Sequence, residues 1–248
     1  MIDNGLILYQ FSGAWGLSSF SPFCIKLECW LRLAGIAYES RVADMRRAPK
    51  GKIPFVRVDG QLLGDSQLIV EHLTAKHGIQ LDAGLGADQV ALAHLIRRTV
   101  EEAFYFALVA QRWRNDSSFA VLRGPFAAAM PKFIGPLILP LVRRSIRKKL
   151  QGQGTGRHSD AEYQAMAIAD VAALAQILGD QRYMLGDTVR SVDATVFAHL
   201  LGCGAFPEPS PLRDAVRGNR KIAAYLHRIA DQFWQNSPID VAAAGFAR

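Results

Sequence analysis

The chain is poor in cysteine, and its few cysteines form no motif. Cys24, Cys29 and Cys203 include no Cys-x-x-Cys pair and cannot make an even disulfide framework. We therefore expect free thiols in a reducing compartment, and hence a cytoplasmic location. Residues 1–5 lack the basic and apolar regions of a secretory signal.

Long apolar runs are also absent. The most apolar stretch, residues 133–142, is interrupted by Pro136 and Pro140. It falls short of the roughly 20 apolar residues that a bilayer requires, so no transmembrane helix is expected. Half of all residues are nevertheless hydrophobic, which provides a large core and excludes a disordered chain.

Acidic residues are outnumbered by basic ones. The chain has 29 Lys and Arg against 22 Asp and Glu, which gives a formal net charge of +7 and favours anionic partners. One predicted helix carries five of the basic residues: Arg143, Arg144, Arg147, Lys148 and Lys149. A solvated helix face is the favoured interpretation, and contact with an anionic membrane surface is the alternative. No aromatic residues are interleaved with these charges, so nucleic acid is not an expected partner. No metal site is expected either.

The first strand and helix are signalled by composition and by a capping pattern. Residues 5–11 are rich in strand formers, and a loop over residues 12–19 follows. Ser21 and Pro22 are typical of a helix start, because serine accepts an amide bond there and proline gives up no needed donor. Helical spacing of apolar residues continues to Gly35.

A second strand and a hairpin follow this helix. Residues 38–42 are a predicted strand, and residues 55–58 and 61–63 flank Asp59 and Gly60, a strong two-residue hairpin signal. A further helix begins at the Asp-Ser pair of residues 65–66 and reaches about residue 77. This order predicts a small α/β domain over residues 1–80.

The rest of the chain has helical periodicity almost throughout. A linker is predicted at residues 82–86, before an all-helical domain over residues 88–248. The predicted helices cover residues 91–113, 119–129, 137–150, 161–178, 192–201 and 222–233. Glycine and proline predict breaks at residues 124–125, 135–136, 152–156 and 207–211.

Four motifs carry a family resemblance. The tetrapeptide Ser-Pro-Phe-Cys at residues 21–24 resembles the redox motif of glutaredoxins with serine in place of the first cysteine. Residues 52–54 resemble a cis-proline segment, and residues 65–66 resemble a glutamyl-binding pair. Residues 183–197 resemble a C-terminal-domain folding motif. By their order and spacing the chain is identified as a member of the glutathione S-transferase superfamily. This implies a thioredoxin-like N-terminal domain and an all-helical C-terminal domain.

A narrower resemblance covers nearly the whole chain. Residues 112–113, 154–158 and 193–197 are similar to the branch named for failed axon connections, which is related to the metaxins. Two functions are implied. One is conjugation of glutathione to a hydrophobic electrophile, as in detoxification. The other is a non-catalytic binding or scaffold protein that acts through partner or membrane-surface contacts. The resemblance also implies a homodimer.

Glutathione requires an anchor for its glutamyl end and backbone pairing for its cysteinyl unit. Ser66, at a helix N-terminus, offers donors to the glutamyl carboxylate, and Asp65 can accept from the ammonium. A cis bond before Pro54 leaves the backbone of Ile53 free for strand-like pairing. Lys52 adds positive charge near a carboxylate of the ligand.

The thiol needs a group that stabilises its thiolate form, which is the nucleophile. Ser21 is the candidate, because a hydroxyl donor and a helix N-terminus both lower a thiol pKa. An ordinary helix cap is the competing interpretation. Tyr9, Ser18 and Ser19 are alternative activating groups, whereas Cys24 is expected to be buried and structural.

Aromatic residues mark the first long helix of the second domain. Phe104, Tyr105, Phe106 and Trp113 are mostly expected in the core. The resemblance places this helix beside the electrophile pocket, so Tyr105 or Trp113 is expected to touch a hydrophobic co-substrate. Asp193 is expected to be structural.

Overall fold

The computed structural model describes residues 5–128, 135–235 and 239–248. Residue 129 of one predicted helix and residues 133–134 of the apolar stretch lie outside these ranges. In the described part of the chain, no helix is long and apolar enough to cross a bilayer.

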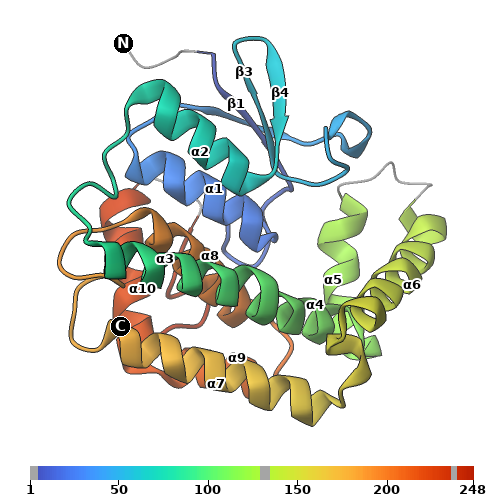
Figure 1. Cartoon of the computed structure of the whole chain (residues 1–248). Coiled ribbons are helices and arrows are strands. Elements are labelled where there is room, and N and C mark those ends of the chain that lie inside the picture. Colours follow the sequence, from blue (N-terminus) through green and yellow to red (C-terminus); the bar gives the residue numbers. More distant parts are fainter. Residues whose placement is uncertain (1–4, 129–134, 236–238) are drawn as a thin grey trace.

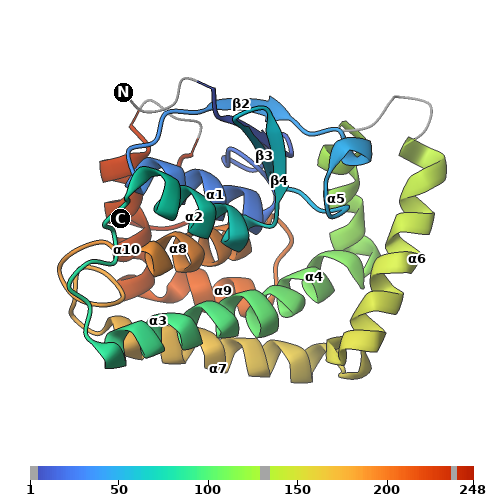
Figure 2. The same ribbon diagram turned by 45° about the horizontal axis from the view of Figure 1, so that its top comes forward.

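A four-stranded mixed sheet forms the first layer (Figures 1 and 2). Its strands are β1 (Ile7–Gln10), β2 (Glu39–Val42), β3 (Phe55–Val58) and β4 (Gln61–Gly64), in the order β2-β1-β3-β4. β1 pairs in parallel with β2 and antiparallel with β3, which pairs antiparallel with β4. Asp59 and Gly60 make the β3–β4 turn with φ values of 50° and 78°, so the predicted hairpin is confirmed.

Two helices cover one face of this sheet. α1 (Pro22–Leu33) begins with proline in its first turn, and α2 (Ser66–His77) ends at Gly78 in the left-handed conformation. α1 is buried on nearly every side, because it lies between the sheet and helix α8 of the second domain (Figure 1). With the sheet, these helices make the expected thioredoxin-like unit.

The second domain is helical, as expected. Its helices are α3 (Ala87–Arg98), α4 (Tyr105–Trp113), α5 (Asp116–Ala128), α6 (Gly135–Gln153), α7 (Asp160–Leu178), α8 (Ser191–Gly204), α9 (Pro211–Gly218) and α10 (Arg220–Phe233). Short turns of 3-10 helix occur at η1 (Met45–Arg47) and η3 (Thr155–Arg157). α3 and α4 follow one another as a long rod with α7 alongside, and α5 and α6 stand at its far end (Figures 1 and 2).

Three details of the predicted helices are wrong. The helix predicted over residues 91–113 begins earlier, at Ala87, and contains a π-helical segment, η2 (Thr99–Phe104). α5 runs through Pro125, where a break was expected. The carbonyl left without its amide partner belongs to Val121, which is itself only partly buried. Pro211 starts the unpredicted helix α9, because proline suits a first turn and Ser210 accepts a bond from the amide of Arg213.

The two domains share one apolar core. Polar contacts also join them: the indole of Trp30 on α1 donates to the hydroxyl of Ser191 on α8 at 3.2 Å. Asp193 is fully buried and accepts from the amides of Met184 and Arg190 at 2.9 and 2.7 Å. These bonds fix the start of α8, which fits the structural role expected of Asp193.

Candidate functional site

A cavity of about 660 Å³ lies between the sheet domain and helices α4, α5 and α6. We call it the interdomain cavity. Every residue that the sequence proposed for glutathione binding lines it: Ser21, Lys52, Ile53, Pro54, Asp65 and Ser66. These residues come from three separate loops, so the fold brings them together. Their roles remain predictions.

The N-terminus of α2 forms one end of the interdomain cavity. Asp65 caps this helix, and its Oδ1 accepts from the amides of Gln67 and Leu68 at 3.0 and 3.2 Å. Both bonds end on Oδ1, which leaves Oδ2 available to a cationic group. Asp65 has a φ of 81°, a costly conformation for a residue other than glycine and one that clusters at ligand sites. Ser66 follows directly and is buried.

A second part of the cavity wall is the segment before β3. The peptide bond between Ile53 and Pro54 is cis, as the sequence predicted. Ile53 is half-buried, whereas the neighbouring Lys52 is exposed at the cavity rim. The backbone of Ile53, which was predicted to pair with the ligand, is therefore next to the positive charge of Lys52.

The start of α1 forms the third part of the wall. Ser21 is the N-cap residue of α1 in position, yet within the described part of the chain its hydroxyl makes no capping bond. The Ser21 hydroxyl therefore does not cap the helix. It lies beside the Cys24 thiol, whose pKa it lowers by hydrogen bonding, against the larger effect of burial. The thiol of Cys24 lies one turn further and is fully buried, and this burial raises its pKa to about 11. Cys24 is thus a neutral, structural thiol at physiological pH.

The alternative activating groups, Tyr9, Ser18 and Ser19, are not among the residues that line the cavity in the described part of the chain. Tyr9 lies outside the cavity lining and stacks on Phe55, with ring centroids 4.7 Å apart. Ser19 is fully buried, and its hydroxyl accepts from the amide of Ser21 at 3.3 Å. Neither Ser19 nor Ser18 is among the described residues that line the cavity. The geometry therefore favours Ser21 over all three.

The rest of the cavity lining is mainly apolar, with many aromatic side chains. Tyr105 and Trp113 line it, as the resemblance implied, and α6 contributes Ile146 and Leu150. Aromatic side chains from three elements also meet there: Phe11, Phe20, Phe106 and Phe126. The rings of Phe20 and Phe126 lie 5.3 Å apart, and those of Trp113 and Phe126 lie 5.2 Å apart. Such a wall suits a hydrophobic molecule.

A buried ion pair lies at the cavity wall. Lys26 of α1 contacts Glu101 of η2 at 2.5 Å, and Thr195 of α8 donates to the same carboxylate at 3.2 Å. Glu101 lines the cavity and belongs to the π-helical segment, a distortion that is frequent at functional sites. The sequence alone does not indicate this pair, because its two members are 75 residues apart. The signal that could have found it is a lysine within the apolar residues of α1.

Of the five basic residues on α6, Arg143 is structural and Lys149 lines the cavity. Arg144, Arg147 and Lys148 are exposed, which fits the solvated face that was expected. The loop at residues 154–158 packs on the end of α6, where Gln151 donates to the carbonyl of Gly156 at 2.6 Å.

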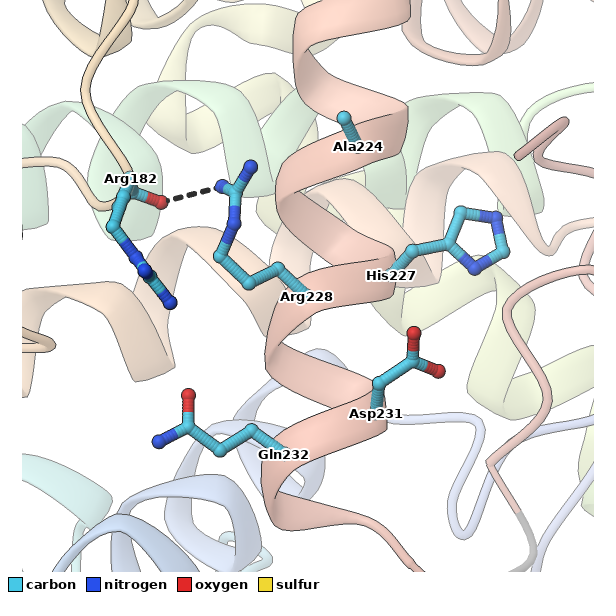
Figure 3. Close-up of a pocket in the computed structure, with 6 residues that line it drawn as sticks. All are labelled: Arg182, Ala224, His227, Arg228, Asp231 and Gln232. Atoms are coloured by element: carbon cyan, nitrogen blue, oxygen red, sulfur yellow. Dashed lines mark hydrogen bonds between the residues drawn. The ribbon is translucent and has the colours of Figure 1, made fainter.

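A second cavity of about 450 Å³ lies on α10 (Figure 3). Arg228 points toward Arg182 and donates to its carbonyl at 2.7 Å, whereas His227 and Asp231 lie on the other side of the helix. Asp231 is paired with Arg248 at 3.2 Å. None of the predicted site residues lies there. In the described part of the chain, no three His, Cys, Asp or Glu residues gather as metal ligands.

Family models match both halves of the chain. The glutathione S-transferase N-terminal domain matches residues 22–119, and the glutathione S-transferase C-terminal domain matches residues 167–229. An isoprene-epoxide glutathione S-transferase of Rhodococcus sp. (strain AD45) is 32% identical over 92% of this chain and 99% of its own length. The chain therefore belongs to the glutathione S-transferase family.

Other relatives place the chain near a particular branch of that family. Failed axon connections of Drosophila melanogaster is 31% identical over 79% of this chain and 49% of its own length. Metaxin-1 of Mus musculus is 26% identical over 92% of this chain and 74% of its own length. A solved β-etherase from Sphingobium sp. strain SYK-6 shares the fold, with a TM-score of 0.62 and 19% identity over 94% of this chain and 99% of its own.

Proposed function

We propose that this protein binds reduced glutathione in the interdomain cavity and transfers its thiol to a hydrophobic electrophile. The observation that carries the proposal is the composition of the cavity. Its lining combines Ser21, Ile53 and Ser66 and their neighbours with a large set of aromatic side chains. Reduced glutathione suits the reducing, cytoplasmic compartment expected from the three buried free cysteines.

Each of the three loops that carry these residues would hold one part of the tripeptide. Ser66 and the N-terminus of α2 bind the glutamyl carboxylate, and Asp65 Oδ2 accepts from the ammonium. The backbone of Ile53 pairs with the cysteinyl unit, and Lys52 contacts the glycyl carboxylate. Ser21 then donates to the sulfur and favours the thiolate, helped by the N-terminus of α1.

An epoxide is the first electrophile to test. One relative of high coverage is named for an isoprene epoxide. In such a reaction the thiolate attacks a ring carbon, a C–S bond forms, and the C–O bond breaks. The released alkoxide takes a proton from water. The apolar part of the cavity lining would contact the hydrocarbon part of the epoxide.

Calorimetric titration of glutathione tests the binding site. We expect the dissociation constant to rise about tenfold in Ser66→Ala, because a charge-assisted hydrogen bond is lost. Ser159→Ala is the matched control: Ser159 also starts a helix, accepting from the amide of Glu162 at 3.3 Å, but lies outside the cavity lining. No binding by the wild type at millimolar glutathione would sink the proposal.

A non-catalytic binding protein is the second candidate. The similarity to Failed axon connections and metaxin-1 favours it, as do the exposed cations Arg144, Arg147 and Lys148 of α6. Consumption of an epoxide with glutathione separates the candidates. If glutathione binds but no electrophile is consumed, sedimentation with vesicles containing anionic lipid follows, with all three cations changed to Gln as the control.

We further propose that the protein is a homodimer, on the family resemblance alone. Light scattering should then give a mass near twice 27.2 kDa. A mass near that of one chain would refute the dimer without touching the proposed reaction.

A further inference from the structure

Arg112 is a buried cation in the wall of the interdomain cavity. It lies on α4, lines the cavity, and is only 6% exposed. Its guanidinium donates to the carbonyl of Phe20 at 2.8 Å and to that of Gly202 at 2.6 Å. The rings of Trp15 and Phe206 flank it, with centroids 5.5 and 5.4 Å from Cζ. Backbone and aromatic groups thus surround the charge.

In the described part of the chain, no carboxylate lies within ion-pairing distance of this charge. Across residues 5–128, 135–235 and 239–248, Arg112 forms no ion pair, and its Nε is buried without a hydrogen-bond partner. Other buried or half-buried cations nearby are paired: Lys26 contacts Glu101 at 2.5 Å, and Arg143 contacts Asp116 at 2.7 Å. Burial lowers the pKa of Arg112 to about 10, so the side chain still carries its charge at neutral pH.

An unpaired buried cation is costly, and an anion nearby offsets the cost. Because Arg112 lines the cavity, a ligand bound there could supply this anion. Phe20, whose carbonyl accepts from Arg112, directly precedes Ser21. A Cβ on Gly202 would lie 3.3 Å from the ring of Pro22 and 3.6 Å from Nη2 of Arg112. The guanidinium therefore packs against the first turn of α1, where the proposed function places the glutathione sulfur.

We propose that Arg112 is an anion-stabilising residue that holds the glutathione sulfur as a thiolate. The inference rests on the proposed function, because it places the sulfur beside Ser21. Two contributions then add at the sulfur: the N-terminus of α1 with the Ser21 hydroxyl, and the charge of Arg112 in a poorly hydrated place. Arg112 also fixes the loop before α1 through the carbonyl of Phe20. One side chain thus couples the second domain to the thiol chemistry of the first.

Two unreactive glutathione analogues distinguish recognition of a negative charge at the sulfur position from binding of the rest of the tripeptide. Glutathione sulfonate carries a negative charge at the sulfur position, and S-methylglutathione carries none. Calorimetry should show that the wild type prefers the sulfonate and that Arg112→Gln reduces this preference about tenfold. Arg112→Lys should keep most of it at pH 7. The absorbance of bound thiolate should show the glutathione thiol pKa rising by about one unit in Arg112→Gln.

Arg114→Gln is the matched control. Arg114 follows α4, donates to the carbonyl of His158 at 2.7 Å and lies over the ring of Tyr163, but it is paired with Asp160 and is outside the cavity lining. The control should keep the sulfonate preference. Circular dichroism of each variant shows whether it is folded.

If Arg112→Gln does not fold, the Arg112→Lys variant by itself tests the proposed role of Arg112. A lysine in this buried place loses its proton before arginine does, so its sulfonate preference should fall as pH rises from about 7 to 10. A preference that is independent of pH in Arg112→Lys, or unchanged in Arg112→Gln, would overturn the inference and leave the proposed function standing. A wild type that binds neither analogue would overturn both.

Discussion

At the scale of single residues, the proposed function assigns Ser21 rather than Cys24 to the glutathione sulfur. Ser21 lines the interdomain cavity and makes no capping bond within the described residues, whereas Cys24 is fully buried with its pKa raised to about 11. We expect Ser21→Ala to lower kcat/KM about 10- to 100-fold, since it loses a hydrogen bond to the thiolate. Cys24→Ala should stay within about twofold of the wild type. Initial rates with an epoxide measure both, and equal losses in the two variants would contradict the assignment.

His199 links protonation to stability at the same scale. It is fully buried, its Nδ1 lies 2.9 Å from the carbonyl of Thr195, and burial lowers its pKa from 6.5 to about 4. Between these values the unfolded chain binds a proton that the folded chain does not, so stability falls as pH falls from about 6.5 to 4. The shift corresponds to about 3 kcal/mol.

The contribution of His199 is isolated by comparing variants. In urea unfolding at several pH values, the wild type should lose about 3 kcal/mol more than His199→Gln between pH 7 and 4. The other titrating groups are common to both proteins and cancel in the difference. His72→Gln is the control, since His72 is exposed. A wild type and a His199→Gln variant with the same pH dependence would disprove the assignment.

Among the helices, α6 carries neighbouring arginines in different environments: Arg143 is bonded to other elements, whereas Arg144 is exposed. Arg143 donates to the carbonyls of Trp113 and Arg114 at 3.0 and 2.7 Å, and so satisfies the end of α4. It also pairs with Asp116. Arg144, the next residue, is exposed.

The two arginines should therefore differ in their effect on stability. We expect Arg143→Gln to lower the free energy of unfolding by about 1–2 kcal/mol, because two carbonyls lose charged donors. Arg144→Gln should change it by less than about 0.5 kcal/mol. Urea denaturation followed by tryptophan fluorescence measures both. Similar losses in the two variants would show that α6 acts through its total charge.

Elements that local residues specify could be predicted from the sequence. The β3–β4 turn follows from Asp59 and Gly60, and the start of α1 follows from Pro22, although Ser21 makes no capping bond there. The π-helical segment η2 could not be predicted, because no local residue pattern marks it. Glu101 within it contacts Lys26 of α1 and Thr195 of α8, which are distant in the sequence. For the same reason the site was predicted only in part. Its loop motifs are local, whereas Arg112 reaches it from α4.

At the scale of the whole molecule, the two domains pack together through a shared apolar core. The division at residues 80 and 88 stays a prediction. α1 lies against α8, and the buried pair of Lys26 and Glu101 crosses the contact between the domains. Gln67 of α2 accepts from Lys26 at 3.0 Å, so three elements depend on this ammonium group. Desolvation lowers the pKa of Lys26, and the adjacent charge of Glu101 opposes that effect.

Removing one charge of this pair should cost more than removing both. We expect Lys26→Met to lower the free energy of unfolding by about 3–5 kcal/mol, because Glu101 stays buried without its lysine. Lys26→Met combined with Glu101→Leu should recover most of that loss, since no buried charge is stranded. Lys221→Met is the surface control: Lys221 pairs with exposed Asp180 at 2.9 Å, and its loss should change stability by less than about 1 kcal/mol. If the double variant were as unstable as Lys26→Met, the pair would hold the domains together by shape rather than by compensating charge.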